Sequence, residues 1–223
     1  MPSTSKPRTS PTLSTKRALV LATSSPQSVS GLSPRLTARR FRQLGLWLGD
    51  SAGFELLHHV IELPFGSPAF LHDAEAGVRF GRNPIYATLH ESSYADGAAT
   101  RWSAHRLLPN EVVEQGFFTA EHIFPWMWED YGALEPQRAV AELLAERAWL
   151  ALYDAEQLRR NDVPVAATIY VNDLYVERDF AVETAATIRG LRAWQTDEFE
   201  HSGLRDNGER VLGRLIDLAS GRA

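Results

Sequence analysis

The stretch Val163-Pro-Val-Ala-Ala-Thr-Ile-Tyr-Val171 decides the fold class of this chain. It is a nearly continuous apolar run rich in β-branched residues, which is typical of a strand buried on both faces. After it, residues 181–189 predict a short helix, residues 191–199 a second strand and residues 208–220 an amphipathic helix. The order strand, helix, strand, helix predicts an α/β fold with a parallel sheet.

Two parallel strands form a small sheet, because sheets usually contain about five or six strands. We therefore expect the sheet within residues 161–223 to be incomplete. An incomplete sheet leaves a strand edge open, and an open edge pairs readily with another polypeptide. Either a chain that supplies further strands or a second copy of this chain would fit that edge.

The region before these strands, residues 35–160, has the spacing of helices, with apolar residues recurring every three or four positions. A short helix is expected over residues 69–80. The aromatic-rich segment 117–131 is expected to belong to the core, with an apolar substrate pocket as the alternative. The other expected helices carry Phe41, Leu44, Trp47 and Leu48; Phe54, Leu57, Val60 and Ile61; Ile85 and Leu89; and, over residues 136–153, Val140, Leu143, Leu144 and Leu150.

The composition narrows the possible chemistry. The chain has 223 residues, a formal net charge of −5 and no cysteine. The lack of cysteine excludes disulfides, iron–sulfur clusters and thiol nucleophiles. All of the sequence before Asp50 is free of acidic residues, whereas the remainder is strongly acidic. An acidic body argues against nucleic acid as the main partner.

Residues 1–33 are rich in Ser, Thr and Pro and show neither a helical nor a strand period. This composition predicts a disordered leader, and it also resembles an organellar transit peptide. The apolar run 18–22 is too short for a membrane span, which needs about 20 residues. We therefore expect a cytoplasmic protein that has no membrane partner.

Two pairs of polar residues follow the predicted strands. Asn172-Asp173 follows the first strand and Glu200-His201 the second. The carboxyl ends of parallel strands meet at one edge of a sheet, where ligands bind. An acid and a histidine there would form two members of a Ser-His-Asp relay, in the chain order of α/β-hydrolases. The alternative is a loop aspartate and a surface histidine.

Other motifs give weaker signals. His58 and His59 are adjacent on a predicted helix, so their side chains point about 100° apart and suit one metal poorly. His90-Glu91 lacks the second histidine of a zincin motif. The sequence has no P-loop and no Gly-x-Gly-x-x-Gly. We therefore expect neither a metal nor an organic cofactor.

The sequence resembles the proline iminopeptidases, which are serine aminopeptidases of the α/β-hydrolase fold. Val163-Pro-Val-Ala-Ala-Thr-Ile-Tyr-Val-Asn-Asp-Leu-Tyr-Val-Glu-Arg-Asp-Phe180 resembles their acid-bearing segment. Arg189-Gly-Leu-Arg-Ala-Trp-Gln-Thr-Asp-Glu-Phe-Glu-His-Ser-Gly-Leu-Arg205 resembles their histidine segment. Their helical cap is resembled by Leu36-Thr-Ala-Arg-Arg-Phe41, Gly53-Phe-Glu-Leu-Leu-His58, Tyr86-Ala-Thr-Leu-His-Glu-Ser-Ser-Tyr94 and Phe118-Thr-Ala-Glu-His-Ile-Phe-Pro-Trp126.

The resemblance implies a partial α/β-hydrolase fold in three regions. These are the leader 1–33, a helical cap over 34–160 and the C-terminal part of the hydrolase core over 161–223. It also implies a peptide or amino-acid amide substrate with an N-terminal residue such as proline. A polypeptide that supplies the N-terminal half of the hydrolase is then the partner expected at the open sheet edge.

The resemblance implies a role for four residues. Asp173 would be the triad acid and His201 the triad base. Glu91, and Glu121 as a second match, would hold the free α-amino group of the substrate, since a buried ammonium needs a carboxylate partner. The alternative for each glutamate is a solvated helix face.

The resemblance further implies a serine nucleophile on a Gly-x-Ser-x-Gly elbow. We predict that this elbow is absent and that the chain alone is inactive. Gly31-Leu-Ser-Pro-Arg35 lacks the second glycine, and Gly66-Ser67 has neither the spacing nor a preceding strand. Three functions remain open: an enzyme part, a non-catalytic remnant or binding module, and one half of a two-chain hydrolase.

Overall fold

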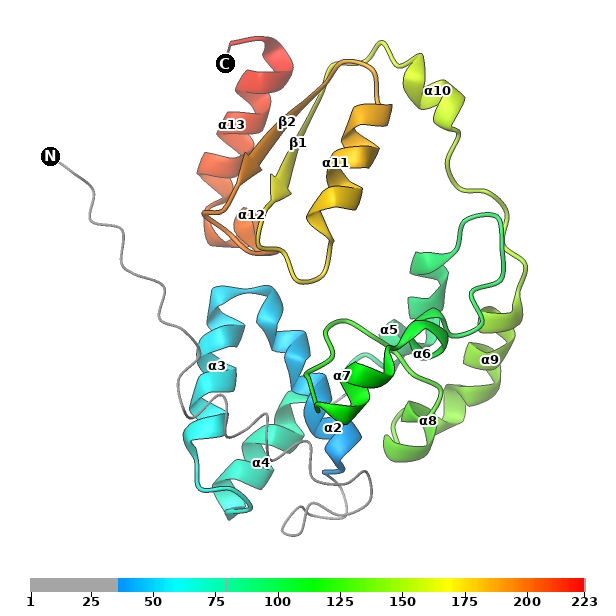
Figure 1. Cartoon of the computed structure of the whole chain (residues 1–223), viewed down its shortest axis with the longest axis vertical. Helices are drawn as coiled ribbons and strands as arrows, with labels where there is room; N and C mark the ends of the chain where they lie inside the picture. Colours follow the sequence, from blue (N-terminus) through cyan, green and yellow to red (C-terminus); the bar gives the residue numbers. More distant parts are fainter. Residues whose placement is uncertain (1–35, 79, 223) are drawn as a thin grey trace, which may run out of the picture.

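The computed structural model describes residues 36–78 and 80–222. The leader predicted over 1–33 lies outside these residues. The described chain has a helical part followed by a smaller part that contains the two strands. Figure 1 shows the strand-bearing part at one end and the helical part at the other. The 34–160 and 161–223 regions expected from the resemblance remain predictions, since nothing beyond this division tests their bounds.

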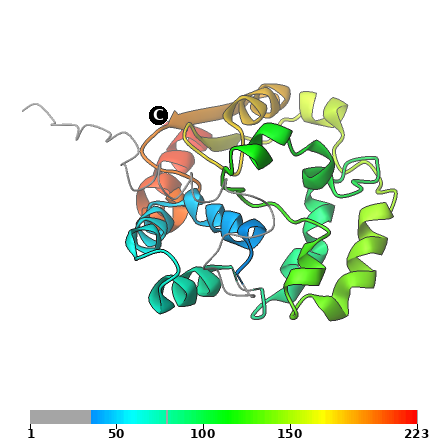
Figure 2. The same cartoon turned by 60° about the horizontal axis from the view of Figure 1, so that its bottom comes forward.

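The helical part is built from short segments that surround a common core, with α2 to α4 on one side and α5 to α9 on the other in Figure 2. Its elements are α2 (Ala38–Arg42), the 3₁₀ helix η1 (Gln43–Gly49), α3 (Ser51–Glu62), α4 (Pro68–Gly77), α5 (Pro84–Leu89), η2 (His90–Tyr94), α6 (Ser103–Leu107), α7 (Asn110–Glu114), α8 (Met127–Asp130), η3 (Glu135–Gln137), α9 (Arg138–Glu146) and α10 (Ala155–Arg159).

Side-chain caps define where several of these helices begin. The Asp50 carboxylate accepts a hydrogen bond from the backbone N–H of Gly53 at 2.6 Å, and Ser67 Oγ accepts one from Phe70 at 3.2 Å. Both satisfy N–H groups that have no partner within the helix. Helices are present in the three regions where the apolar spacing predicts them, although the first changes from α to 3₁₀ at Gln43 and α4 ends at Gly77, before the predicted end at residue 80.

The core lies in the helical part and is rich in aromatic side chains. Phe124, Trp128 and Tyr131 are almost fully buried, together with Phe41 and Phe70. Phe41 packs against Phe70 with ring centroids 5.7 Å apart. The prediction that the aromatic-rich segment belongs to the core is confirmed for these side chains.

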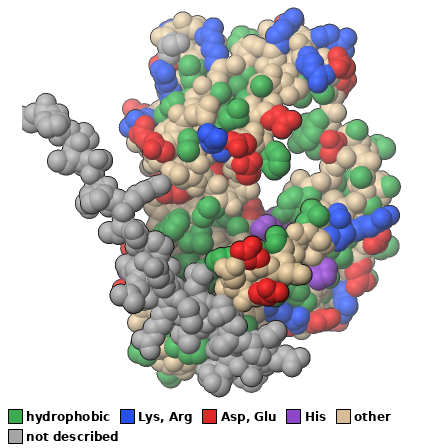
Figure 3. All heavy atoms as spheres, in the orientation of Figure 1, with side chains coloured by type: hydrophobic (Ala, Val, Ile, Leu, Met, Phe, Trp, Pro, Cys, Tyr) green, Lys and Arg blue, Asp and Glu red, His purple; other side chains and the backbone are tan. Residues whose placement is uncertain are grey.

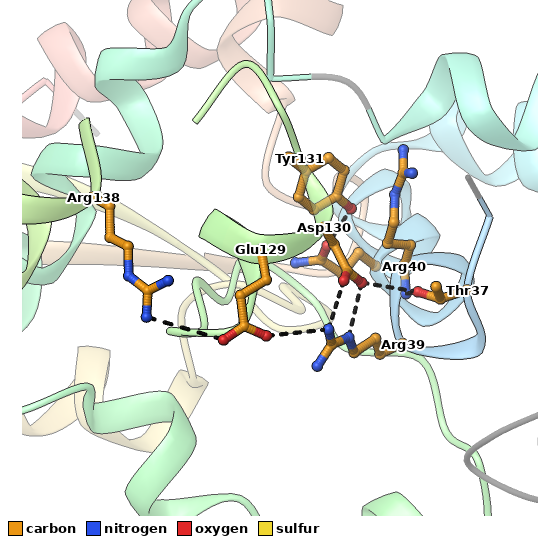
Figure 4. A network of polar contacts seen from close by, with 8 residues as sticks. Thr37, Arg39, Arg40, Glu129, Asp130, Tyr131 and Arg138 are labelled. Carbon is orange, nitrogen blue, oxygen red and sulfur yellow. Dashed lines mark hydrogen bonds and ion pairs between the residues drawn. The ribbon is translucent and has the colours of Figure 1, made fainter. Parts of the chain in front are cut away.

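A polar network on the surface of this core joins α2 to α8 and α9 (Figure 4). The Arg39 guanidinium donates to both carboxylate oxygens of Asp130, at 2.8 and 2.5 Å, and it lies 4.6 Å from the Trp126 ring. Glu129 lies between Arg39 and Arg138, at 3.6 and 4.0 Å. The bidentate pair fixes the start of the helical part against its aromatic centre.

The prediction of one helix over 136–153 that buries its large aliphatic side chains is wrong. The helix α9 ends at Glu146, and its buried residues are Ala141 and Ala145, whereas Leu143 is 72% and Leu150 88% exposed. The small alanines allow α9 to approach α5 and η2 closely, which turns the large aliphatic side chains outward. Beyond Glu146, the backbone pairs with the 97–98 segment instead of continuing the helix, through bonds from Trp149 N to Ala98 O at 3.4 Å and from Gly97 N to Leu150 O at 3.3 Å.

The predicted apolar residues of α5 are also turned outward. Ile85 is 54% and Leu89 47% exposed. The buried residues of this region are Ala87 and Thr88, followed by His90 and Glu91 in η2. The buried face therefore carries polar side chains, which is unusual for a core position.

The strand-bearing part confirms the predicted parallel pair. β1 (Val165–Tyr170) pairs with β2 (Leu191–Thr196), in register from Val165 opposite Leu191 to Tyr170 opposite Thr196. The connecting helix is α11 (Arg178–Thr187), and β2 is followed by α12 (Gly203–Asp206) and α13 (Gly208–Ser220).

The prediction that the first strand is buried on both faces is wrong for the described residues. Ile169 is buried, but the other residues of β1 are only partly covered. Among the described residues, the sheet has two strands, so β1 has a neighbouring strand on one edge alone. The apolar run is therefore suited to more burial than this chain provides.

Leu134 and Leu143 offer a test of which leucines form the core. Leu134 is fully buried and Leu143 largely exposed. We expect Leu134→Ala to lower the free energy of unfolding by about 2–5 kcal/mol, because it removes buried methyl groups and leaves a cavity. We expect Leu143→Ala to change it by less than about 0.5 kcal/mol. Urea unfolding monitored by tryptophan fluorescence measures both, and equal losses would contradict the observed orientation of α9.

Candidate active site

Asp173 and His201, which lie 28 positions apart, converge at the carboxyl ends of the two strands. His201 Nδ1 lies 2.9 Å from Asp173 Oδ2. The Asp173 side chain is 5% exposed, and its other oxygen accepts hydrogen bonds from the backbone N–H groups of Tyr175 and Val176, at 2.8 and 3.1 Å. The carboxylate is therefore fixed in orientation. When Nδ1 donates to it, Nε2 is left as the proton acceptor.

His201 is also held by the corner between η1 and α3. Its backbone N–H donates to the Gly49 carbonyl at 2.9 Å. The Tyr175 ring meets the imidazole edge to face with centroids 5.0 Å apart, and the Tyr175 hydroxyl donates to the Leu46 carbonyl. A Cβ atom on Gly49 would lie 2.1 Å from the Tyr175 ring, so this corner requires glycine.

Sequence reasoning missed Tyr175 and Gly49. Tyr175 lies two residues after Asp173, so its proximity to the carboxylate was visible in the sequence, but its contacts with His201 and Leu46 were not. The contact with Leu46 joins segments 129 positions apart, and no local pattern reports either contact. Burial raises the pKa of Tyr175, with a further contribution from Glu121.

The His201 imidazole opens into a cleft of about 610 Å³ between the two parts of the chain. Glu121 lines the same cleft, so a predicted substrate-binding carboxylate lies near the predicted acid–histidine pair. The cleft is lined by Gly49, Asp50, Glu121, Tyr175, His201, Ser202, Leu204 and Arg205.

Glu121 is held by aromatic hydroxyl groups. Its carboxylate accepts a hydrogen bond from Tyr86, and its carbonyl accepts one from the Tyr94 hydroxyl at 3.0 Å. His90 Nε2 lies 3.1 Å from the same carbonyl. Burial and the bond to Glu121 raise the pKa of Tyr86, so this phenol remains a donor at neutral pH. Glu121 is therefore a positioned acceptor and not a mobile surface group.

Glu91 is buried away from the cleft. It is 1% exposed, one carboxylate oxygen accepts a hydrogen bond from Ser103 N at 3.3 Å, and the other has no partner among the described residues. The alternative of a solvated helix face is therefore wrong for Glu91. The structure brings Glu121 to the His201 cleft but does not place Glu91 among the residues that line it.

The prediction that the chain has no Gly-x-Ser-x-Gly is wrong, because Gly49-Asp50-Ser51-Ala52-Gly53 fits the pattern. Its geometry differs from that of a nucleophile elbow, which lies between a strand and a helix and is strained. Ser51 follows a 3₁₀ helix, and its hydroxyl donates to Glu200 Oε2 at 2.8 Å. Within the described residues, the non-glycine residues with positive φ are Arg101 and Trp102.

The remaining histidines make no metal site in the part of the chain that the structure describes, where no group of three His, Asp or Glu could hold an ion. His58 contacts Glu62 on its own helix at 3.3 Å. Burial lowers the pKa of His122, and the charge of the nearby His90 lowers it further.

Across residues 36–78 and 80–222, every helix is too short or too polar to cross a membrane.

Comparison with known proteins shows what the chain is similar to. It is 46% identical over 195 residues to the proline iminopeptidase of Aeromonas sobria, covering 82% of this chain and 46% of that protein. The chain is a homologue of proline iminopeptidases. The fungal homologue aneH of Aspergillus aculeatus, also named a proline iminopeptidase, is 33% identical over 203 residues. This confirms the resemblance seen in the sequence.

Coverage limits what the homologous enzymes say about this chain. The second match covers 84% of this chain and 45% of the Aspergillus protein. The chain therefore spans about half the length of the proline iminopeptidases that it matches. No protein-family model matches the sequence.

Ser51 can be tested directly as a nucleophile. We expect a fluorophosphonate probe to leave Ser51 unlabelled, because its hydroxyl is bonded to Glu200 and lies on an ordinary helix start. Intact-mass and peptide mass spectrometry of the wild type, Ser51→Ala and His201→Ala would show equal labelling in all three. Labelling of Ser51 that disappears in His201→Ala would establish it as the nucleophile and contradict this reading.

Proposed function

We propose that this chain carries the acid–histidine pair and an amine-binding carboxylate of a proline iminopeptidase-like serine aminopeptidase with a partial α/β-hydrolase fold. The observation that carries the proposal is the 2.9 Å contact from His201 Nδ1 to Asp173, whose other oxygen accepts two backbone hydrogen bonds. Glu121 in the same cleft and the homology to proline iminopeptidases support it.

The geometry suits general acid–base chemistry. His201 Nε2 would accept the proton of a serine hydroxyl as that oxygen attacks the carbonyl of the first peptide bond. Asp173 would keep the proton on Nδ1 and stabilise the imidazolium that forms. The imidazolium would then give its proton to the leaving amine, and a water activated by the same nitrogen would release the N-terminal residue from the acyl-enzyme.

Glu121 would select substrates with a free N-terminus. A prolyl N-terminus is a secondary ammonium with two N–H donors, and a desolvated ammonium needs a carboxylate partner. The Tyr86 hydroxyl donates to one Glu121 oxygen, which fixes the carboxylate and leaves the other oxygen available for the substrate. A peptide blocked at its N-terminus would lack this contact.

The nucleophile in this proposal is a serine outside the described residues. Ser51 fits the sequence pattern, but its hydroxyl is directed to Glu200 and its helix does not follow a strand. The oxyanion donors of such an elbow come from the same region of a hydrolase sheet. Without that nucleophile and those donors, the two strands and the cleft of this chain would bind the substrate without cleaving it.

The amine-binding role predicts a charge-dependent affinity. We expect L-prolinamide to bind the wild type and Glu121→Gln to weaken that binding roughly 10-fold or more, because a hydrogen bond to a charged group is worth about 1.5–3 kcal/mol. Isothermal titration calorimetry measures both. The matched control is Glu111→Gln, a change at an exposed carboxylate outside the cleft. Equal affinity for N-acetyl-L-prolinamide would contradict the proposal.

The free edge of the sheet supports a second proposal, assembly with a polypeptide that supplies further strands. Val171 N donates to Thr196 O across the sheet at 2.9 Å, so Val165, Ala167 and Ile169 face β2. Because strand residues alternate, the backbone groups of Ala166 and Thr168 face the opposite, free edge.

Exposed apolar side chains around the sheet support the same proposal of assembly with further strands. Phe180 is 70% exposed, and Leu174, Leu212 and Ile216 are each at least half exposed. Figure 3 shows hydrophobic side chains spread among charged ones on one face of the molecule, including the strand-bearing part. Burial of these side chains against further strands or helices would be favourable.

Blocking the edge tests the assembly. We expect the chain alone to self-associate with rising concentration, because an unpaired strand edge and apolar surface are both accessible. Ala166→Pro removes an N–H that faces the free edge and leaves the bonds to β2 intact, so it should return the chain to a monomer. Ala166→Ser is the matched control. Light scattering coupled to size exclusion measures the mass, and a wild-type monomer at all concentrations would contradict an edge that pairs between copies of this chain.

A further inference from the structure

The cleft at His201 is lined by side chains of opposite charge. Glu121 contributes a carboxylate, and Arg205, four residues after His201, lines the same cleft of about 610 Å³. Arg205 belongs to α12, the short helix that follows the histidine. The acid–base chemistry of His201 and the amine contact of Glu121 leave this arginine without a task.

The Arg205 side chain is exposed, and within the part of the chain that the structure describes its guanidinium makes no hydrogen bond or ion pair. Other arginines nearby in the sequence differ in this respect. Arg210 pairs with Glu198 at 2.6 Å. The Arg192 guanidinium donates to the carbonyl of Leu218 at 2.5 Å. Because a guanidinium offers five N–H donors in a planar fork and no acceptor, the ligand that suits Arg205 is an anion such as a carboxylate.

Two further carboxylates in this region are engaged with other donors. Asp50, which also lines the cleft, caps α3 by accepting the backbone N–H of Gly53 at 2.6 Å. Asp206, next to Arg205 in the sequence, accepts the Ser202 hydroxyl at 2.7 Å. Neither of them forms an ion pair with Arg205. An arriving carboxylate would therefore meet a guanidinium that has no ion pair to give up.

The chemistry of His201 sets the direction of a bound peptide in the cleft. Its Nε2 must give a proton to the leaving amine, so the residue after the scissile bond lies next to the imidazole. Glu121 lines the cleft from the helical part, whereas Arg205 lines it from α12, at the end of the strand-bearing part that faces α3 (Figure 1). Two extended residues span about 7 Å. A dipeptide is therefore long enough to carry its two end charges to different walls of the cleft.

We propose that Arg205 binds the C-terminal carboxylate of a dipeptide substrate and so favours peptides with a single residue after the scissile bond. The inference rests on the proposed function, since Glu121 must hold the ammonium at the other wall. A dipeptide zwitterion then matches the charges of the cleft, with its amide bond at His201. Guanidinium and carboxylate can pair through two parallel N–H···O bonds. Arg205 would thus contribute to binding and leave the proton transfers to His201.

The test compares L-prolylglycine with L-prolylglycinamide, which replaces the C-terminal carboxylate by a neutral amide. We expect the wild type to bind the acid about fivefold more tightly, because an ion pair at an exposed arginine is weakened by solvent. Arg205→Gln should remove this advantage, and Arg205→Lys should keep part of it, since the charge remains without the planar fork. Arg214→Gln is the matched control, because this exposed arginine of α13 does not line the cleft. Isothermal titration calorimetry provides the affinities, and added sodium chloride should reduce the advantage of the acid.

The outcomes separate this inference from the proposed function. If Glu121→Gln weakens both ligands but the wild type binds them equally, or if Arg205→Gln leaves the preference for the acid intact, the Arg205 proposal is wrong and the aminopeptidase proposal stands. If neither ligand binds, both are wrong. If N-acetyl-L-prolylglycine binds as tightly as the dipeptide, the amine contact is wrong and the inference that depends on it is wrong too. Should Arg205→Gln fail to fold by circular dichroism, Arg205→Lys decides, because an unchanged preference in that variant would contradict the proposal.

Discussion

The candidate active site depends on how the corner between η1 and α3 meets the loops that follow the two strands. Tyr175 is central to that contact. Its backbone N–H holds Asp173, its ring contacts His201, and its hydroxyl bonds to Leu46 in the helical part. Gly49 provides the space for the ring and accepts a hydrogen bond from His201 N. The imidazole is thus oriented by groups from both parts of the chain, so loss of the corner would separate the histidine from Glu121 even if both parts stayed folded.

The parallel pair, its connecting helix and the approach of Asp173 to His201 could all be predicted from the sequence. They follow from local pattern, since an apolar run predicts β1 and the carboxyl ends of parallel strands lie at one edge. The orientation of α9 could not be predicted in this way. The hydrophobic pattern favoured burial of Leu143, but Ala141 and Ala145 allow closer packing against α5 and η2, and the backbone bond from Arg101 to Ala145 is tertiary.

The Gly-x-Ser-x-Gly pattern around Ser51 can be read from the sequence, but its structural context cannot. A five-residue pattern carries chemical meaning only in the correct structural context. Here that context is a 3₁₀ helix followed by a capped α-helix, with Asp50 as the cap and Glu200 as the acceptor for the hydroxyl. The motif instead fixes the corner on which His201 rests, through the carbonyl of Gly49. It therefore contributes to the site as support for the base.

The two predicted carboxylates have different environments, and this difference assigns them different tasks. Glu121 has a hydroxyl donor and faces a cleft, so it can exchange water for a ligand at modest cost. Glu91 has one backbone donor and one unpartnered oxygen in a fully buried position, where an uncompensated charge is expensive. Glu91 therefore holds the backbone at Ser103, whereas Glu121 faces the cleft, where a ligand can reach it.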